Sequence, residues 1–459
     1  MPADPRAPYR LVQALLPDTA SRFIRDRPML RRLLSSGIWR VGDQIFRMGT
    51  GVLVSVYVAR YLRPTGFGLI SFAAAMGTLV TAIAQFGMFT VVVRELVRRP
   101  QDRAEIVGSA LALRLVTGAI SVFLALGTTV WIRPYDHHAL LIVLIVAVVA
   151  LPRAWDVIDY DYQARIEARP VVIARNVAFT AFAILRPLLV LVHAPVEAFA
   201  AAITGEQVLA SVLLARRWRA DGLTVGVRSA TLRELRDMVL TTWPLVIANL
   251  STIVYMRIDA LMLASMSGDA SVGLFSAATK VSEALYFIPT AAVATVAPAL
   301  TAAHRRSRTE YNRQLLRVMR TLVWLAIPVA VIFACSSRFI IPGLYGPSYA
   351  PAAAVLSIHA WINVLMTLNI CSNQWLLDEG DFRCNMYQTL VGAAVNIGLN
   401  LVLIPRLGIV GAALASCAGQ ISSVMLMAAV IPKTRPLFRL QLASLAPLDL
   451  RWPFGLRGR

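Results

Sequence analysis

Long apolar stretches separated by short polar connections run along almost the whole chain. Each stretch has about twenty or more residues, the length with which a helix crosses the hydrocarbon core of a bilayer. The sequence does not show the roughly ten-residue alternating segments that are typical of a membrane β-barrel. It therefore predicts an all-α, polytopic membrane protein with about 12 transmembrane helices, at 37–62, 67–93, 104–132, 138–158, 170–192, 195–217, 237–266, 271–300, 316–336, 349–376, 384–404 and 408–431.

The connections between these helices alternate in charge. Arginines gather around residues 94–103, 165–169, 216–236 and 305–317, whereas the connections in between are short and poor in cations. Because cytoplasmic loops of membrane proteins are rich in Lys and Arg, the basic connections are expected to be cytoplasmic. An even number of helices then places both termini in the cytoplasm. The Arg-rich, Lys-poor usage is typical of a GC-rich bacterial genome, so the expected location is a bacterial inner membrane.

The composition narrows the class of protein further. The chain has 459 residues, of which 58% are hydrophobic and 15% charged, whereas about 25% are charged in a typical soluble domain. The net charge is +20, but the basic residues are scattered between apolar stretches, so a nucleic-acid surface is not expected. Four cysteines without a CxxC pattern predict neither a disulfide framework nor a zinc site.

No signature of catalysis is found either. The sequence contains no GxxxxGK[ST] motif for ATP, and neither a Ser-His-Asp nor a Cys-His arrangement can be argued from it. We therefore expect a protein that is not an enzyme and has no cofactor, although a gradient of H⁺ or Na⁺ can drive transport.

Two halves of six helices are indicated by a weak internal repeat. Trp39 precedes a helix, a short loop and the sequence Phe67–Ala73, and Trp243 stands in the same relation to Val272–Ala277. Parallel repeats of this kind predict a central cavity between two lobes that rock between inward-open and outward-open states. The expected divisions are an N-terminal basic segment 1–36, an N-lobe 37–218, a basic linker 219–236, a C-lobe 237–431 and a basic tail 432–459 that is too broken to span.

Cationic side chains inside the predicted helices are the candidate binding residues. Ionisable groups in membrane helices usually face the bundle interior, and arginine presents a planar fork of donors that suits phosphate oxygens. A cationic cavity for an anionic headgroup is therefore predicted from Arg40, Arg47, Arg257, Arg114, Arg175 and Lys280. The alternative is a set of structural ion pairs or snorkelling side chains.

The acidic residues inside the helices are the candidates for coupling to an ion: Asp43, Asp259 and Glu283. Asp156, Asp159 and Asp161 lie beside arginines near one helix end. A solvated, ion-paired helix end is favoured there over a metal site, because no His or Cys partners are near.

Several short motifs resemble those of the Wzx-type polysaccharide flippases of the multidrug/oligosaccharidyl-lipid/polysaccharide (MOP) exporter superfamily. The resemblance covers roughly residues 37–431. The matching stretches are 59–68, 94–96, 155–160, 257–259, 272–278, 344–346 with 349, 396 with 400, 404–405 and 411–413.

This resemblance implies a MATE-like fold of two six-helix lobes and a transporter that flips undecaprenyl-diphosphate-linked oligosaccharide for O-antigen, capsule or exopolysaccharide biosynthesis. It also implies membrane lipid, a polysaccharide polymerase and a chain-length regulator as partners. The lipid II flippase branch is not expected, because its two extra C-terminal helices are missing. The alternatives are a multidrug or cation antiporter of the same superfamily, a sugar-polymerising membrane enzyme and a scaffold. The excess of interior arginines counts against the antiporter.

Overall fold

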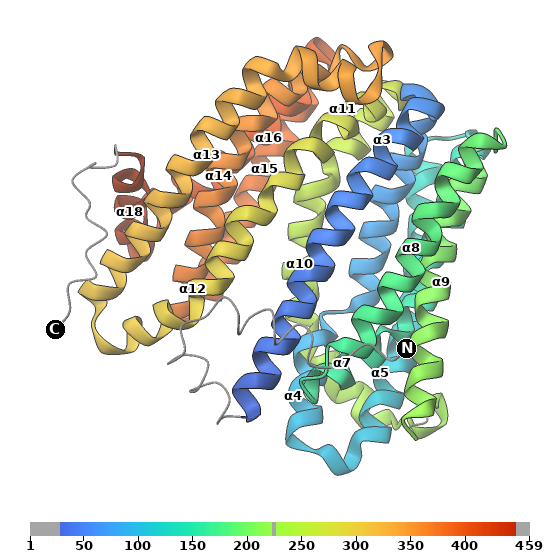
Figure 1. Cartoon of the computed structure of the whole chain (residues 1–459), viewed down its shortest axis with the longest axis vertical. Helices are drawn as coiled ribbons and strands as arrows, with labels where there is room; N and C mark the ends of the chain where they lie inside the picture. Colours follow the sequence, from blue (N-terminus) through green and yellow to red (C-terminus); the bar gives the residue numbers. More distant parts are fainter. Residues whose placement is uncertain (1–27, 223–225, 447–459) are drawn as a thin grey trace. The chain divides into compact units, whose positions relative to one another are not determined.

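A computed structural model describes the backbone of residues 28–222 and 226–446. Side chains are described in these ranges except at 28–41, 43, 45, 244–245, 247–249, 251 and 382–383. All regular elements in the described ranges are helices (Figure 1). Their contacts divide the chain into two units. Unit 1 comprises the described residues up to Tyr61 together with Phe72–Ile253, and unit 2 comprises Leu62–Ser71 together with the described residues from Val254 onward.

Unit 1 contains most of α3 and the helices that follow it up to the first half of α10. These elements are α3 (Pro28–Gln85), α4 (Met88–Arg98), η1 (Pro100–Asp102), α5 (Arg103–Ile132), α6 (His137–Ala147), η2 (Val148–Ala150), η3 (Pro152–Asp156), α7 (Val157–Ala164), α8 (Arg169–Leu191), α9 (Val196–Ala220), η4 (Val227–Ser229) and α10 (Leu232–Met266).

Unit 2 contains the second half of α10 and the helices after it, with residues 62–71 of α3. These elements are α11 (Gly268–Glu283), η5 (Ala284–Tyr286), α12 (Phe287–Arg306), α13 (Arg308–Tyr345), η6 (Pro347–Tyr349), α14 (Ala352–Asp378), α15 (Phe382–Leu407), α16 (Ile409–Ile421), the π-helix η7 (Ser422–Leu426), α17 (Met427–Val430), η8 (Pro432–Thr434) and α18 (Arg435–Leu445).

The described residues contain ten helices that are long and apolar enough to cross a membrane. The first, Phe46–Arg98, has 53 residues. At 1.5 Å per residue, its helical segments add up to about 80 Å, which is enough for two crossings of a hydrocarbon core of about 30 Å. It holds the predicted helix 67–93 and most of 37–62. The predicted helix 237–266 lies in α10, part of which falls outside the described side chains. The prediction of an all-α, polytopic membrane protein is therefore confirmed.

Several predicted helices contain a break that the apolar pattern does not reveal. The break at Arg63, which has a positive φ of 57° directly before Pro64, is different, because it lies in the predicted connection between 37–62 and 67–93. The predicted helix 67–93 is interrupted where Phe86 and Gly87 take positive φ values of 48° and 63°. The predicted helix 138–158 changes from α6 through η2 to η3, which begins at Pro152.

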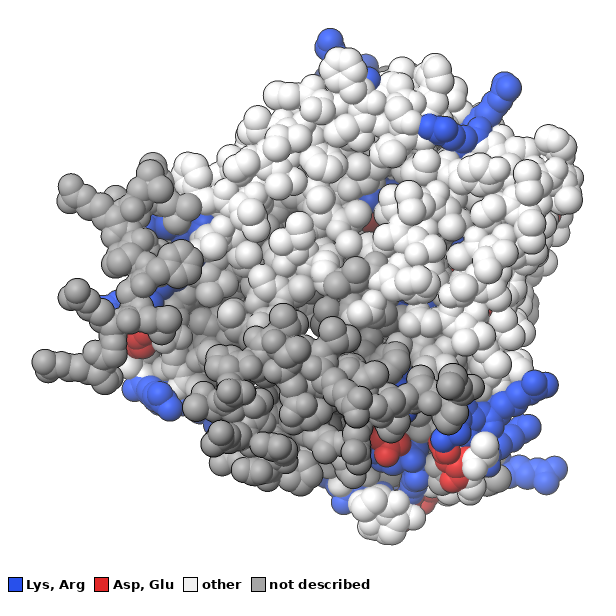
Figure 2. All heavy atoms as spheres, in the orientation of Figure 1, with Lys and Arg blue, Asp and Glu red and all other residues white. Residues whose placement is uncertain are grey.

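Each unit has an apolar core of its own. In unit 1 the core includes Met88 of α4, Ile106 of α5 and Trp218 of α9. In unit 2 it includes Leu315 of α13 and Trp375 of α14. Figure 2 shows Lys and Arg gathered over unit 1 where the lower ends of α4, α5 and α9 lie, while few charges appear over the middle of these helices. This distribution is typical of helices that pass through a bilayer.

The segment after Pro432 differs from the predicted tail because part of it is a packed helix. α18 lies against α13 and α17, and its Leu437 is fully buried. The buried Gln441 amide donates to Ser372 Oγ at 2.8 Å and to the Val424 carbonyl at 3.1 Å. The spacing of Leu437, Gln441 and Ser444 places them on one helical face, which is the sequence signal for this packing. A helix of eleven residues is too short to cross a membrane. The predicted segment 1–36 lies mostly outside the described residues, which begin at 28.

The two repeated motifs contact each other within unit 2. A Cβ atom on Gly68 would lie 1.8 Å from the carbonyl oxygen of Asp269, and one on Gly273 would lie 1.9 Å from the carbonyl oxygen of Pro64. Each glycine also lies close to the backbone nitrogen of the other. The contact is therefore reciprocal, and only residues without a side chain allow the backbones of α3 and α11 to approach so closely. The lobe boundaries at 218 and 237 stay a prediction.

Replacing either glycine with alanine should destabilise the protein. We expect Gly68→Ala and Gly273→Ala to cost roughly 1–3 kcal/mol, because the added methyl meets backbone that has to move. The measurement is the melting temperature of the purified protein in detergent, read from the monodisperse fraction after heating. Gly127→Ala in α5, where nothing lies within 4 Å, is the control and should not destabilise the protein. Equal melting temperatures for all three variants would contradict the close approach.

Candidate functional site

A carboxylate bridges two arginines in the membrane-spanning part of unit 1. Glu206 of α9 accepts from Arg47 of α3 at 3.3 Å through one oxygen and from Arg186 of α8 at 2.6 Å through the other. Arg47 also donates to the main-chain carbonyl of Arg175 at 3.3 Å. Its guanidinium carbon lies 4.7 Å from the centre of the Phe179 ring. This set joins three helices through one acidic side chain.

A second set of ion pairs continues from the same helix. Arg175 of α8 contacts Asp156 at 3.2 Å and Asp159 at 3.1 Å. Asp156 also lies 3.7 Å from Arg114 of α5, and Arg114 donates to the hydroxyl of Tyr160 at 2.8 Å. The expected ion pairs of this helix end agree with these contacts, whereas the expected solvation was wrong, because Asp156, Asp159 and Asp161 are all buried. No group of three or more His, Cys, Asp or Glu side chains that could hold a metal occurs in the described part of the chain.

Positive charge exceeds negative charge in these two sets. Four arginines face three carboxylates, which gives a net charge of +1 (4 − 3), and the members are Arg47, Arg114, Arg175, Arg186, Asp156, Asp159 and Glu206. Their exposures within the structure differ. The side chain of Arg47 is 34% exposed and that of Arg175 is 33% exposed, whereas that of Arg114 has no exposed surface. Arg47 and Arg175 can therefore meet an external anion, and Arg114 supports them from within.

In unit 2, the predicted cations lie on or next to α11. Arg257 of α10 pairs with Glu283 of α11 at 3.7 Å. Lys280 of α11 is exposed, and its ammonium lies 4.6 Å from the centre of the Phe67 ring. Arg257 keeps 35% of its side-chain surface exposed. A cation of this unit can thus also present donors to an anion.

Asp259 lies in a separate polar nest of unit 2. It is 7% exposed and accepts from the amides of Asn396 at 3.0 Å and Asn400 at 2.6 Å, both on α15. Its other oxygen accepts from the hydroxyl of Ser416 on α16 at 2.7 Å. The amide oxygen of Asn400 is buried and has no hydrogen-bond partner. Carboxylate, amide and hydroxyl oxygens are the ligands that hard cations prefer, so this nest is the part of the described structure best suited to a small cation.

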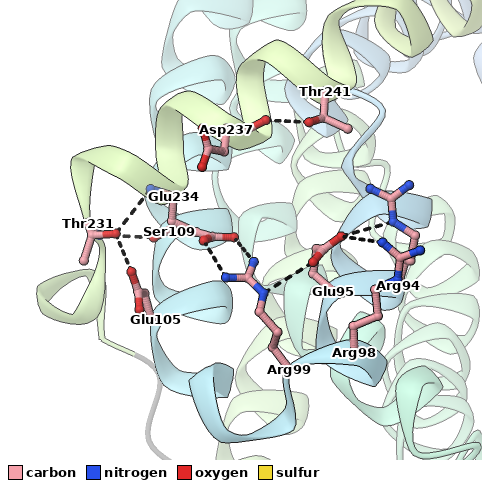
Figure 3. Close-up of polar contacts among 10 residues, drawn as sticks. All are labelled: Arg94, Glu95, Arg98, Arg99, Glu105, Ser109, Thr231, Glu234, Asp237 and Thr241. Atoms are coloured by element: carbon pink, nitrogen blue, oxygen red, sulfur yellow. Dashed lines mark hydrogen bonds and ion pairs between the residues drawn. The ribbon is translucent and has the colours of Figure 1, made fainter.

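A charged network ties the end of α4 to the start of α10 in unit 1 (Figure 3). Arg99 donates to both carboxylate oxygens of Glu234, at 2.9 and 3.3 Å, and also pairs with Glu95 at 3.4 Å. The hydrogen bond to Glu234 raises the pKa of the Arg99 guanidinium. Thr231 accepts from the backbone N–H of Glu234 at 3.3 Å and donates to Glu105 at 2.5 Å. The network fixes the part of the predicted linker that enters α10.

The predicted site residues thus fall into two units. Arg47, Arg114 and Arg175 are joined in unit 1, where Glu206 and Arg186 complete the network. Arg257, Lys280, Asp259 and Glu283 lie in unit 2. The side chains of Arg40 and Asp43 are outside the described residues.

Sequence reasoning missed the roles of Glu206 and Ser416. A single glutamate or serine in an apolar stretch gives no indication of its partner. The i, i+4 spacing of Asn396 and Asn400 was the one available signal, because it places two amides on the same face of a helix.

Two solved structures have a similar fold. The lipid II flippase MurJ in an inward closed conformation aligns with a TM-score of 0.69 and 14% identity over 90% of this chain and 91% of that chain. A multidrug resistance MATE family transporter of the MOP superfamily in an inward-facing conformation aligns with a TM-score of 0.62 and 14% identity over 89% and 95%. The fold is therefore MATE-like, as the sequence predicted.

The sequence comparisons identify the family. The model of the polysaccharide biosynthesis protein family matches residues 33–304, and the MatE model matches residues 244–402. The probable flippase AglR of Haloferax volcanii is 25% identical over 193 residues, which are 40% of this chain and 40% of that protein. The chain belongs to the polysaccharide biosynthesis protein family.

Removing the carboxylate of Asp156 should destabilise the protein strongly. Asp156→Asn leaves the fully buried Arg114 and the partly buried Arg175 with one negative charge fewer, and breaking a buried pair in this way costs roughly 3–5 kcal/mol. The measurement is the melting temperature in detergent. Asp237→Asn, on an exposed aspartate of α10, should change stability by less than about 0.5 kcal/mol. The double variant Arg114→Met/Asp156→Leu should recover most of the loss. A melting temperature for Asp156→Asn equal to that of the unaltered protein would refute the assigned pairing.

Proposed function

We propose that this protein flips undecaprenyl-diphosphate-linked oligosaccharide repeat units across the bacterial inner membrane by alternating access. The products would serve O-antigen, capsule or exopolysaccharide biosynthesis, with a polymerase and a chain-length regulator as downstream partners. In this proposal the protein is a transporter rather than an enzyme, and both termini are cytoplasmic. Membership of the polysaccharide biosynthesis family supports the process, and the arginines of the membrane helices support the substrate.

The net charge of +1 in the arginine network of unit 1 is the observation that carries the proposal. A set of purely structural ion pairs needs equal numbers of positive and negative groups, since each unpaired charge is costly in a membrane interior. The excess is typical of a site that is completed by an anionic ligand. A diphosphate supplies at least two negative charges, and moving it through hydrocarbon without partners would be prohibitive.

The geometry around Glu206 suggests how such a ligand is held and released. Glu206 neutralises Arg47 and Arg186 while no substrate is present. Because Arg47 keeps a third of its side-chain surface exposed, phosphate oxygens can reach its free donors without breaking the bridge to α9. The carboxylate then weakens the attraction for the diphosphate. Binding that is too tight would prevent release on the other side, so a nearby carboxylate favours turnover.

Transport against a gradient requires an energy source, and Asp259 is our candidate for the coupling residue. Its nest consists of oxygen and amide groups from three helices, α10, α15 and α16, with no cationic side chain among its hydrogen-bond partners. A proton or Na⁺ bound to the carboxylate would neutralise a buried charge and so change the relative stability of conformations that bury or expose the nest. Rotation of the Asn396 and Asn400 amides would present oxygens to Na⁺ in place of the N–H donors.

The rival function is export of cationic drugs, and the Asp259 nest together with the MatE match is what favours it. A buried carboxylate without a cationic partner can bind a cation directly. The arginine network counts against this function because it would repel the same substrate. The two functions therefore predict different outcomes when an interior arginine is removed. Loss of positive charge should slow flipping, whereas it should leave cation export unchanged or make it faster.

The first functional test is reconstitution into liposomes with a labelled lipid-linked oligosaccharide whose access to the outer leaflet is followed. Arg47→Gln and Arg257→Gln should each slow flipping roughly 10- to 100-fold, because a hydrogen bond to a charged group contributes about 1.5–3 kcal/mol. Arg305→Gln, on an exposed arginine in the last turn of α12, is the control and should flip at the unaltered rate.

Two outcomes would decide against the proposal. Equal flipping by the unaltered protein and both glutamine variants would remove the roles assigned to these arginines. No flipping by the unaltered protein, with efflux of a cationic drug in its place, would establish the antiporter.

The second functional test addresses coupling through Asp259. In liposomes with an imposed H⁺ or Na⁺ gradient, Asp259→Asn should lose the acceleration that the gradient gives, because the amide cannot be charged, while flipping without a gradient continues. Ser416→Ala removes one donor from the same carboxylate and should weaken the acceleration only in part. Asp237→Asn is the matched control. If Asp259→Asn responds to both gradients as the unaltered protein does, the coupling site lies elsewhere.

A further inference from the structure

A groove between α8 and α9 lies outside the arginine network of unit 1. It has a volume of about 490 Å³, and its apolar lining includes Ile173 and Val177 of α8 and Leu213 of α9. Arg169 of α8 and Arg217 of α9 also line it. Because α8 begins and α9 ends at this level, the two arginines stand at the same end of the helix pair. The groove is therefore apolar along the helices and cationic at its end.

The apolar part of the groove opens away from the interior of the unit. Ile173 is 42% exposed and Val177 is 51% exposed. Arg175, which lies between them in the sequence, points the other way and contacts Asp156 and Asp159. α8 is one of the ten helices suited to crossing a membrane, so the exposed apolar residues of the groove would meet acyl chains in a bilayer. The groove is a recess in an apolar face of unit 1.

The charges around the cationic end favour an anion. Segments 165–169 and 216–221 contain five arginines and two acidic residues, which gives a net charge of +3 (5 − 2). Arg217 pairs with Asp221 at 2.9 Å yet keeps 59% of its side-chain surface exposed. Arg216 and Arg219 are exposed next to it. An amphiphile with a phosphate at one end and a hydrocarbon chain at the other complements this surface in both charge and polarity.

We propose that the α8–α9 groove is a binding site for an anionic phospholipid of the membrane. The headgroup phosphate lies between Arg169 and Arg217, whose planar donors suit phosphate oxygens. One acyl chain follows Ile173 and Val177. From Arg169 to Val177 the helix rises about 12 Å, a length comparable to the upper part of an acyl chain. Basic pockets between membrane helices at the cytoplasmic side recognise anionic headgroups in this way. The site does not depend on the transport substrate.

The bound lipid would join α8 to α9 on the outer face, opposite the place where Glu206 joins them within the unit. It would also hold the basic ends of both helices at the level of the phosphate layer. The occupant is a resident phospholipid rather than the polyprenyl carrier. The cationic side chains that line the groove are Arg169 and Arg217, a set that suits the single phosphate of a phospholipid. The larger cationic network lies on the inner side of α8.

The test is native mass spectrometry of the full chain in detergent, titrated with phosphatidylglycerol or phosphatidylcholine of the same acyl chains. The unaltered protein should retain phosphatidylglycerol in preference. Arg169→Gln/Arg217→Gln should reduce that preference about 30-fold, since each cation near a membrane surface contributes about 1 kcal/mol. Arg305→Gln/Arg306→Gln removes the same charge from exposed arginines of α12 that do not line the groove, and should leave the preference unchanged.

Two further variants keep the positive charges. Ile173→Trp fills the apolar path and should weaken retention of phosphatidylglycerol. Arg169→Lys/Arg217→Lys leaves the apolar path open and should keep part of the retention. Unchanged size-exclusion profiles would show that the variants are folded. The proposal is overturned if Arg169→Gln/Arg217→Gln keeps the full preference, or if Arg305→Gln/Arg306→Gln loses as much. It is also overturned if a polyprenyl diphosphate displaces phosphatidylglycerol from the unaltered protein but not from Arg169→Gln/Arg217→Gln, since the groove would then belong to the carrier lipid.

Discussion

A guanidinium group at the centre of a membrane helix costs roughly 2.5 to 3.5 kcal/mol on insertion scales, and the structure of unit 1 depends on how that cost is offset. Each arginine in the network has a carboxylate, a carbonyl or a phenol as a partner, and most of these partners come from another helix. The same contacts that make the arginines tolerable also set the packing of α3, α5, α8 and α9. The proposed substrate site and the fold therefore share one set of side chains, and a change in charge at any of them would affect the packing as well as the site.

The two polar regions of the protein differ in sign and in burial. The arginine network of unit 1 carries excess positive charge and keeps two guanidinium groups partly exposed. The Asp259 nest of unit 2 is built around a carboxyl group, is nearly closed and is satisfied by neutral donors. Each environment is formed by contacts within its own unit.

The apolar pattern predicted the helices well because membrane-spanning segments are defined by local composition. The predicted ion-paired end at Asp156 and Asp159 also followed from residues close in sequence. Long-range pairing could not be read in this way. Arg47 and Glu206 are 159 residues apart, and Asp259 and Ser416 are 157 apart, so no spacing rule relates them. The packing of α18 depends on tertiary contacts as well, since a tail with Pro432 and several arginines gives a weak local signal.

The reciprocal contact between Gly68 and Gly273 makes the crossing of α3 and α11 sensitive to single substitutions. The two glycines hold separate positions in one chain, so either can change alone. A side chain at either one meets backbone of the other segment, and flexible side chains cannot turn aside to make room for it. One substitution at either position is therefore enough to disturb the whole crossing.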